Sequence, residues 1–172
     1  MPSRRQIAPQ QTLDRNAAMQ FKGSWYRLKY APEIRSQYFT EHHLNQHEIN
    51  LIQIDSYTLG ASFCRNSFKM GGVCIFVNKN LNFMNIDLQK FSHERDIEVG
   101  AVKIFVNSAN ICILSIYRAP SGNFALFLDK LEVILNLLHR NNTQLIICGD
   151  LNINYLFENN KKNSFGFFTG LL

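Results

Sequence analysis

Apolar residues run through four short stretches of the chain, each bounded by polar or turn-forming residues, and this pattern predicts β-strands. In the second stretch, Val102, Ile104 and Val106 face one way and Lys103 the other, as in a half-buried strand. Residues 107–110, Asn-Ser-Ala-Asn, separate the second stretch from the third and predict a hairpin turn. The stretches are "GGVCIFV" (71–77), "VGAVKIFV" (99–106), "ANICILSIY" (109–117) and "QLIICGD" (144–150).

The apolar pattern changes period in "SGNFALFLDKLEVILNLLHR" (121–140), which predicts an amphipathic helix. Ser121 and Asn123 are candidate caps, and His139 and Arg140 would lie in the last turn, where cations suit the helix dipole. A strand, a helix and a further strand in this order, together with hairpins, predict an α/β sandwich with sheets inside and helices outside. The residues of the apolar stripe are Phe124, Phe127, Leu128, Leu131, Ile134, Leu135 and Leu138.

The two ends of the chain lack this regularity. Residues 1–36 are rich in Gln, Arg and Pro without a sustained period, so we predict a poorly ordered leader there and a domain over residues 37–172. Ile49, Leu51 and Ile54 alternate with polar residues and predict a strand early in the domain. After Asn154 a polar linker, "NNKKN", leads to a segment without an evident closing element.

Composition narrows the class of protein. A chain of 172 residues is long enough for one domain with a core, and its net charge of +5 suits an anionic partner, although such an excess is also common in proteins that bind none. Four cysteines without a C-x-x-C pair indicate free thiols in a reducing compartment rather than zinc or disulfides. With no secretory signal and no apolar run of membrane-spanning length, we expect a nuclear or cytoplasmic protein that does not engage membranes.

Polar residues capable of chemistry stand where two predicted strands end. Asp150 and Asn152 follow the 144–150 strand, and their oxygens suit Mg²⁺ and a phosphate, yet both residues are also ordinary in turns. Tyr117 and Arg118 end the 109–117 strand and could bind a phosphate, or form a packed ring and a solvated cation. Each pair, taken alone, leaves both readings open.

Two further polar segments favour structural readings. In "TEHHL", Thr40 could cap a helix with Glu41 in its first turn, and the adjacent rings of His42 and His43 would diverge too far to chelate one ion. In "SHERDIEVG", residues 93–96 predict a solvated loop.

Four segments, taken in order, are more specific than any of them alone. Together they resemble the endonuclease domain of non-LTR retrotransposons, within the endonuclease/exonuclease/phosphatase superfamily, over about residues 38–157. The resemblance implies a four-layer α/β sandwich and hydrolysis of a DNA phosphodiester that depends on Mg²⁺ or Mn²⁺. The nick would leave a 3′-hydroxyl that primes reverse transcription. The segments are "FTEHHL", "GASFCRNSFKMGGVCIFV", "ILSIYRAPSGNFALFLDKLEVIL" and "LIICGDLNIN".

The resemblance also implies roles for individual residues. Glu41 matches the metal-binding glutamate, and Asp150 matches the acid that orients or activates the attacking water beside the metal. Tyr117 matches the tyrosine that contacts the scissile phosphate, with Arg118 as its basic, substrate-binding neighbour. Asn152 matches the amide that holds the phosphate. These roles agree with the need of hydrolysis for a cation, a proton acceptor and fixed donors around the phosphate.

The chain also departs from the family pattern. Nothing in residues 1–36 matches the first strand with its site asparagine, and the terminal Asp and Asp-His pair are not reached before Leu172. We therefore expect a domain truncated at both ends, weak or inactive by itself, and without the reverse transcriptase of a full element. The alternatives are a non-catalytic remnant that binds nucleic acid or protein, and a phosphomonoesterase of the same superfamily.

Overall fold

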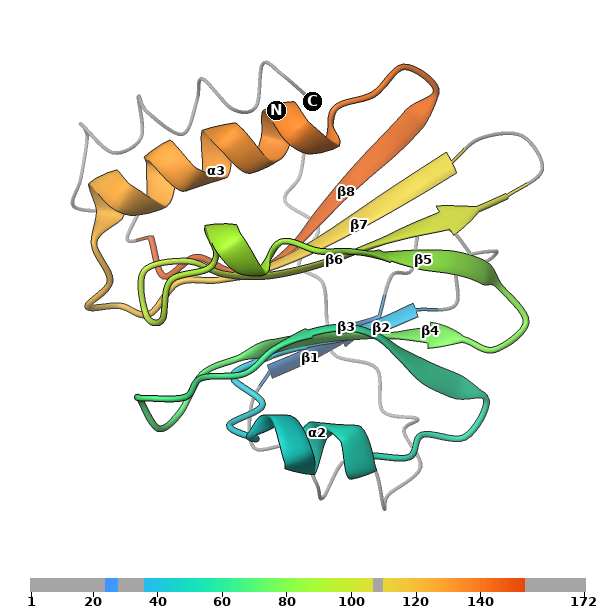
Figure 1. The fold of residues 1–172 in the computed structure, drawn as a ribbon, viewed down its shortest axis with the longest axis horizontal. Coiled ribbons are helices and arrows are strands. Elements are labelled where there is room, and N and C mark those ends of the chain that lie inside the picture. Colours follow the sequence, from blue (N-terminus) through green and yellow to red (C-terminus); the bar gives the residue numbers. More distant parts are fainter. Residues whose placement is uncertain (1–23, 28–35, 107–109, 154–172) are drawn as a thin grey trace, which may run out of the picture.

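Two β-sheets face each other between two helices in the computed structural model, which describes residues 24–27, 36–106 and 110–153. The layers follow one another as helix α2, a first sheet, a second sheet and helix α3 (Figure 1). This arrangement confirms the predicted four-layer α/β sandwich. None of the described helices is both long and apolar enough to cross a membrane.

The first sheet is antiparallel throughout, in the order β1-β2-β4-β3. Helix α2, Gln46–Leu51, packs on its outer face, where Phe39 and Phe76 meet edge to face with ring centroids 5.9 Å apart. The strands are β1 (Ser24–Arg27), β2 (Ser36–Thr40), β3 (Tyr57–Phe63) and β4 (Val73–Asn78).

The second sheet is antiparallel in the order β5-β6-β7, and β8 is added parallel to β7. Parallel neighbours need a crossover, and α3, Phe124–Leu138, provides it. A short 3₁₀ turn, Gln89–Phe91, precedes β6. The strands are β5 (Asn82–Ile86), β6 (Glu98–Phe105), β7 (Asn110–Tyr117) and β8 (Thr143–Asp150).

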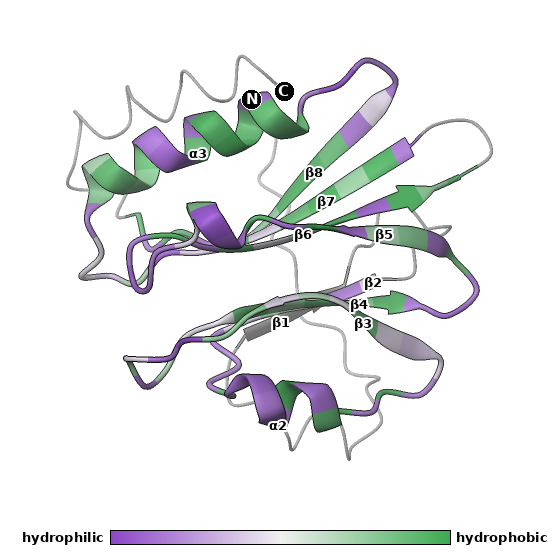
Figure 2. Ribbon diagram, viewed as in Figure 1, coloured by the Kyte–Doolittle hydropathy of each residue, from purple (hydrophilic) through white to green (hydrophobic). Residues whose placement is uncertain are grey.

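Apolar side chains fill the spaces between the layers. Figure 2 shows hydrophobic residues concentrated on α3 and the strands, whereas α2 is largely hydrophilic. Helix α3 begins at the predicted cap, because the Asn123 side chain accepts a hydrogen bond from the Leu126 amide. Its predicted stripe packs on β6 and β7, with Phe124 and Leu128 half-buried and the others buried: Phe127, Leu131, Ile134, Leu135 and Leu138.

The predicted strand at Ile49–Ile54 is wrong, since residues 46–51 form α2. Asn45 and Glu48 form a capping box, and these local hydrogen bonds favour a helix where three apolar residues had suggested alternation. The predicted helix start at Thr40 is also wrong, because Thr40 is the buried last residue of β2.

Strand β1 falls inside the predicted leader, so the ordered fold begins before residue 37. A four-residue edge strand is too short to show a period in the sequence. His139 is the C-cap of α3 rather than a residue of its last turn. The rest of the leader, residues 107–109 of the predicted turn at 107–110, and residues 154–172 lie outside the described residues.

The four cysteines are free thiols, as predicted, and all but Cys64 are buried.

Candidate active site

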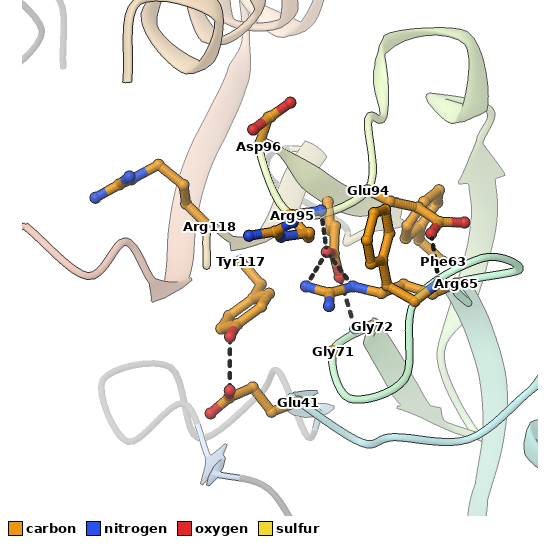
Figure 3. A network of polar contacts seen from close by, with 12 residues as sticks. Glu41, Phe63, Arg65, Gly71, Gly72, Glu94, Arg95, Asp96, Tyr117 and Arg118 are labelled. Carbon is orange, nitrogen blue, oxygen red and sulfur yellow. Dashed lines mark hydrogen bonds and ion pairs between the residues drawn. The ribbon is translucent and has the colours of Figure 1, made fainter. Parts of the chain in front are cut away.

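Three strand ends bring the predicted site residues to one end of the sandwich. In the parallel pairing of β7 with β8, Tyr117 is the direct register partner of Asp150. Glu41 follows β2 in the other sheet, and the Tyr117 hydroxyl donates to Glu41 Oε1 at 2.6 Å (Figure 3). The fold therefore places a phenol and two carboxylates, far apart in sequence, in one neighbourhood.

The Tyr117 hydroxyl is held in its protonated form. The side chain is 3% exposed, and burial raises the pKa of its phenol well above the ordinary value, with the hydrogen bond to Glu41 and the charge of Glu41 acting in the same direction. Tyr117 is therefore a hydrogen-bond donor throughout the neutral pH range. A donor of this kind suits an anionic oxygen.

Two residues of the site have positive φ angles, which residues other than glycine seldom adopt. Glu41 has φ of 57° and Asn152 has φ of 49°. The Glu41 amide donates to the Gly72 carbonyl at 2.8 Å, which helps to hold that conformation. Such backbone strain costs roughly 1–3 kcal/mol and clusters at functional sites.

Asp150 and Asn152 form a tight turn after β8. The Asn152 amide donates to Asp150 Oδ1 at 3.0 Å, and the Asn152 side-chain amide donates to the Arg118 carbonyl at 2.8 Å. Asp150 and Asn152 therefore do stabilise a turn, which was one of the two interpretations of their sequence. It leaves the second oxygen of the Asp150 carboxylate and the side-chain oxygen of Asn152 for other contacts.

Arg118 ties this turn to the start of α3. Its buried guanidinium donates to the carbonyls of Leu151, Asn152 and Gly122 at 2.9, 2.8 and 2.9 Å. It also lies over the Phe124 and Phe127 rings, and Figure 3 shows it extending away from the Tyr117–Glu41 pair. The predicted phosphate contact of Arg118 stays a prediction, whereas the structure gives the residue a positioning role for the turn.

Glu41 and Asp150 carry oxygen atoms of the kind that a hard cation prefers. The hydrogen bonds just described use Oε1 of Glu41 and Oδ1 of Asp150, so Oε2 of Glu41 and Oδ2 of Asp150 remain as possible metal ligands. Mg²⁺ is commonly held by one or two carboxylates and retains several waters. In the part of the chain that the structure describes, no group of three or more His, Cys, Asp or Glu residues could hold a metal. Two carboxylates with waters and substrate oxygens are thus the arrangement that these residues support.

The adjacent histidines serve the fold instead. His42 is buried, with Nε2 3.1 Å from the Phe63 carbonyl, while Nδ1 accepts from the Leu44 amide. His43 Nδ1 accepts from the Gly71 amide at 2.8 Å. Both rings therefore fasten the segment around Glu41 to the loop that ends at Gly72.

His42 should make the fold sensitive to mild acid. Burial lowers its pKa from 6.5 to about 4, so the unfolded chain binds a proton between these values while the folded protein does not. Stability is therefore complete above pH 6.5 and should fall by about 2 kcal/mol between pH 6.5 and pH 5 from this residue. Urea unfolding of the wild type and of His42→Asn at both pH values measures the effect. Equal pH dependence in the two proteins would contradict it.

The sequence reading missed a carboxylate network beside the site. Residues 93–96 were predicted to be a solvated loop, and His93 and Glu94 are both accessible to solvent, but Glu94 also makes hydrogen bonds that the prediction did not include. Glu94 accepts from the amides of Asn66, Ser67 and Phe68, and the fully buried Glu98 pairs with Arg65. The sequence did carry one indication of this ion pair: Arg65 and Glu98 have opposite charges, and each adjoins an apolar segment.

Comparison with known proteins supports the fold reading. No protein-family model matches the chain, and no curated protein matches its sequence. Among solved structures, the endonuclease domain of TRAS1, a telomere-specific non-LTR retrotransposon, aligns with a TM-score of 0.51 and 16% identity. The alignment covers 69% of this chain and 53% of that domain, so the chain spans about half the domain's length. The chain therefore shares the fold of a retrotransposon endonuclease domain, as its sequence motifs predicted.

Proposed function

We propose that the chain carries a metal-dependent site for hydrolysis of DNA phosphodiesters, of the retrotransposon endonuclease type. The observation that carries the proposal is the Tyr117–Glu41 hydrogen bond, with Asp150 as the neighbour of Tyr117 on β8. A protonated donor and two carboxylates at one end of the sandwich are the groups that phosphodiester hydrolysis requires. The fold shared with an endonuclease domain supports the same class of reaction.

Each residue has a distinct task in this proposal. Tyr117 turns its single hydroxyl hydrogen from Glu41 Oε1 to a phosphoryl oxygen when the substrate binds, and Asn152 helps to orient the phosphate. Asp150 accepts the proton of the attacking water, whose oxygen forms a bond to phosphorus while the bond to the 3′-oxygen breaks and that oxygen takes a proton from solvent water. Glu41 and Asp150 would hold Mg²⁺ or Mn²⁺, which neutralises charge on the phosphate. In a retrotransposon, the released 3′-hydroxyl would prime a reverse transcriptase.

DNA is the proposed substrate because the chain shares its fold with a retrotransposon endonuclease domain, and the net charge of +5 is compatible with a polyanion. On this proposal the protein is nuclear, or it is cytoplasmic and meets its DNA substrate after entering the nucleus. The two alternatives predict different products. A non-catalytic remnant would bind DNA without cutting it, and a phosphomonoesterase would release inorganic phosphate from a phosphomonoester.

Nicking of supercoiled plasmid tests the proposal. The whole chain should convert plasmid to the open circle with Mg²⁺ and not with EDTA, and Asp150→Ala should lower the rate by roughly 100-fold or more, since a general base contributes about 10²–10⁴-fold. Asp129→Ala is the matched control, because Asp129 is an exposed acid on α3. It should nick at the wild-type rate.

Three other outcomes would contradict the proposal. Equal nicking by wild type and Asp150→Ala would indicate a contaminant or another site. DNA binding without Mg²⁺-dependent nicking would favour the remnant. Release of phosphate from a monoester by a protein that leaves plasmid intact would favour the phosphomonoesterase.

A further inference from the structure

Glu98 is the centre of a buried network next to the candidate active site. Its side chain is fully buried at the start of β6. Oε1 accepts from Arg65 Nε at 2.6 Å and from the Arg95 amide at 2.8 Å, and Arg65 Nη2 lies 2.5 Å from the same oxygen. Oε2 accepts from the Gly72 amide at 2.6 Å. Both oxygens are therefore occupied by donors.

One route leads from Glu98 to Glu41 through the backbone of Gly72. The amide of Gly72 donates to Glu98, and the carbonyl of Gly72 accepts from the Glu41 amide. Gly72 has φ of 90°, a conformation that favours glycine, so a substitution there would be strained. The position of Gly72 thus fixes the backbone of Glu41, which itself has a left-handed conformation.

A second route leads from Glu98 to Tyr117. Arg65, held by Glu98, places its guanidinium carbon 5.7 Å from the centre of the Tyr117 ring. Glu98 is also the register partner of Tyr117 in the pairing of β6 with β7. The same ion pair is therefore connected to both members of the Tyr117–Glu41 hydrogen bond.

We propose that the Arg65–Glu98 ion pair is a positioning unit that holds Tyr117 and Glu41 in their hydrogen-bonded geometry. Stability alone does not explain the pair, because buried ion pairs often contribute no more than apolar side chains of similar volume. The pair instead fixes two orientations. The guanidinium of Arg65 lies against one face of the Tyr117 ring, and the carboxylate of Glu98 accepts from the Gly72 amide. Its effect on turnover rests on the proposed function; its effect on Tyr117 geometry does not.

The chain offers a matched control. Glu94 holds the same loop as Glu98, but its hydrogen bonds go to the amides of Asn66, Ser67 and Phe68 rather than to Gly72. Glu94→Gln therefore tests what loosening the loop does by itself. Glu98→Gln keeps the side-chain volume and one acceptor oxygen while it removes the charge.

The ionisation of the Tyr117 phenol distinguishes positioning from simple charge. The positive charge of Arg65 favours the phenolate, so its loss alone would raise the pKa of Tyr117 further. If Tyr117 instead moves away from Glu41 and toward water, its pKa falls toward the ordinary value of about 10. The direction of the shift in Arg65→Met decides between the two.

The experiment follows the ¹³Cζ resonance of Tyr117 between pH 8 and pH 11 in the whole chain, assigned by its loss in Tyr117→Phe. The wild type and Glu94→Gln should show no titration in this range. Arg65→Met, Glu98→Gln and the double variant should titrate near the ordinary value for tyrosine. A resonance that stays protonated in folded Arg65→Met and Glu98→Gln would overturn the proposal.

Folding and turnover complete the test. The double variant removes both charges and avoids a buried unpaired ion; if all three variants fail to fold by circular dichroism, the pair is a requirement of the fold and the proposal is overturned. In the nicking assay Glu98→Gln should lower kcat about tenfold with KM unchanged, as for loss of a group that acts only in the transition state. If the wild type does not nick DNA, the proposed function fails while the titration still tests the positioning.

Discussion

Gly149→Ala is expected to destabilise the fold strongly. Gly149 has φ of 139° in β8, and a β-carbon added there would lie 1.7 Å from the carbonyl oxygen of Ile116. The two neighbouring atoms of Ile116 that it would meet, at 2.7 and 2.9 Å, also belong to the backbone. No side chain can rotate away to make room, so either β8 leaves β7 or the peptide is strained.

The expected cost is roughly 3 kcal/mol or more, because an unfavourable φ and a backbone clash act together. Urea unfolding, or the soluble yield if no folded protein remains, measures it. Gly100→Ala is the control: its β-carbon would meet Ala61 and Val73 at 3.5 and 3.6 Å, which is ordinary contact. Stability of Gly149→Ala within about 1 kcal/mol of the Gly100→Ala value would contradict the structure at this position.

Arg118→Met is expected to destabilise the chain and to disorder the turn that carries Asn152. The substitution keeps an apolar stem against Phe124 and Phe127 but removes the donors to three carbonyls. Hydrogen bonds from a charged group each contribute about 1.5–3 kcal/mol, and buried carbonyls left without donors add a desolvation cost. A loss of roughly 3 kcal/mol in urea unfolding follows, since such contributions are not additive.

Arg140→Met is the control for this prediction, because Arg140 is exposed and its side chain donates to the carbonyl of the adjacent His139. It should leave stability within about 0.5 kcal/mol of the wild type. A contrary result would be Arg118→Met with wild-type stability and weaker, less salt-dependent DNA binding. That result would make Arg118 chiefly a phosphate ligand, as the family resemblance implies.

Periodic segments were predicted well because burial imposes a period. The apolar stripe from Phe124 to Leu138 and the mostly apolar strands at 73–78 and 110–117 indicate directly which faces are buried. The crossover between β7 and β8 then placed Tyr117 and Asp150 at the same sheet edge. That part of the candidate site needed only local patterns and the geometry of a parallel pair.

The remaining features depend on contacts that no local pattern carries. Arg65 and Glu98 are 33 residues apart, and Tyr117 and Glu41 are 76 residues apart. Their pairing depends on how two sheets stack, which hydrophobic period does not specify. Helix α2 was missed for a different reason, since six residues are too few for a helical period and the capping box alone marks its start.

Strand β8 has one further consequence, for how this protein behaves at different concentrations. Within the described residues it pairs with β7 along one side, and Leu145, Ile146 and Ile147 are only partly buried. The backbone groups on its other side can accept another strand, from a second molecule or from elsewhere in the same chain. If two molecules pair there, unfolding midpoints rise with protein concentration by mass action. Variants should therefore be compared at one dilute concentration, with a dilution series to reveal any such dimer.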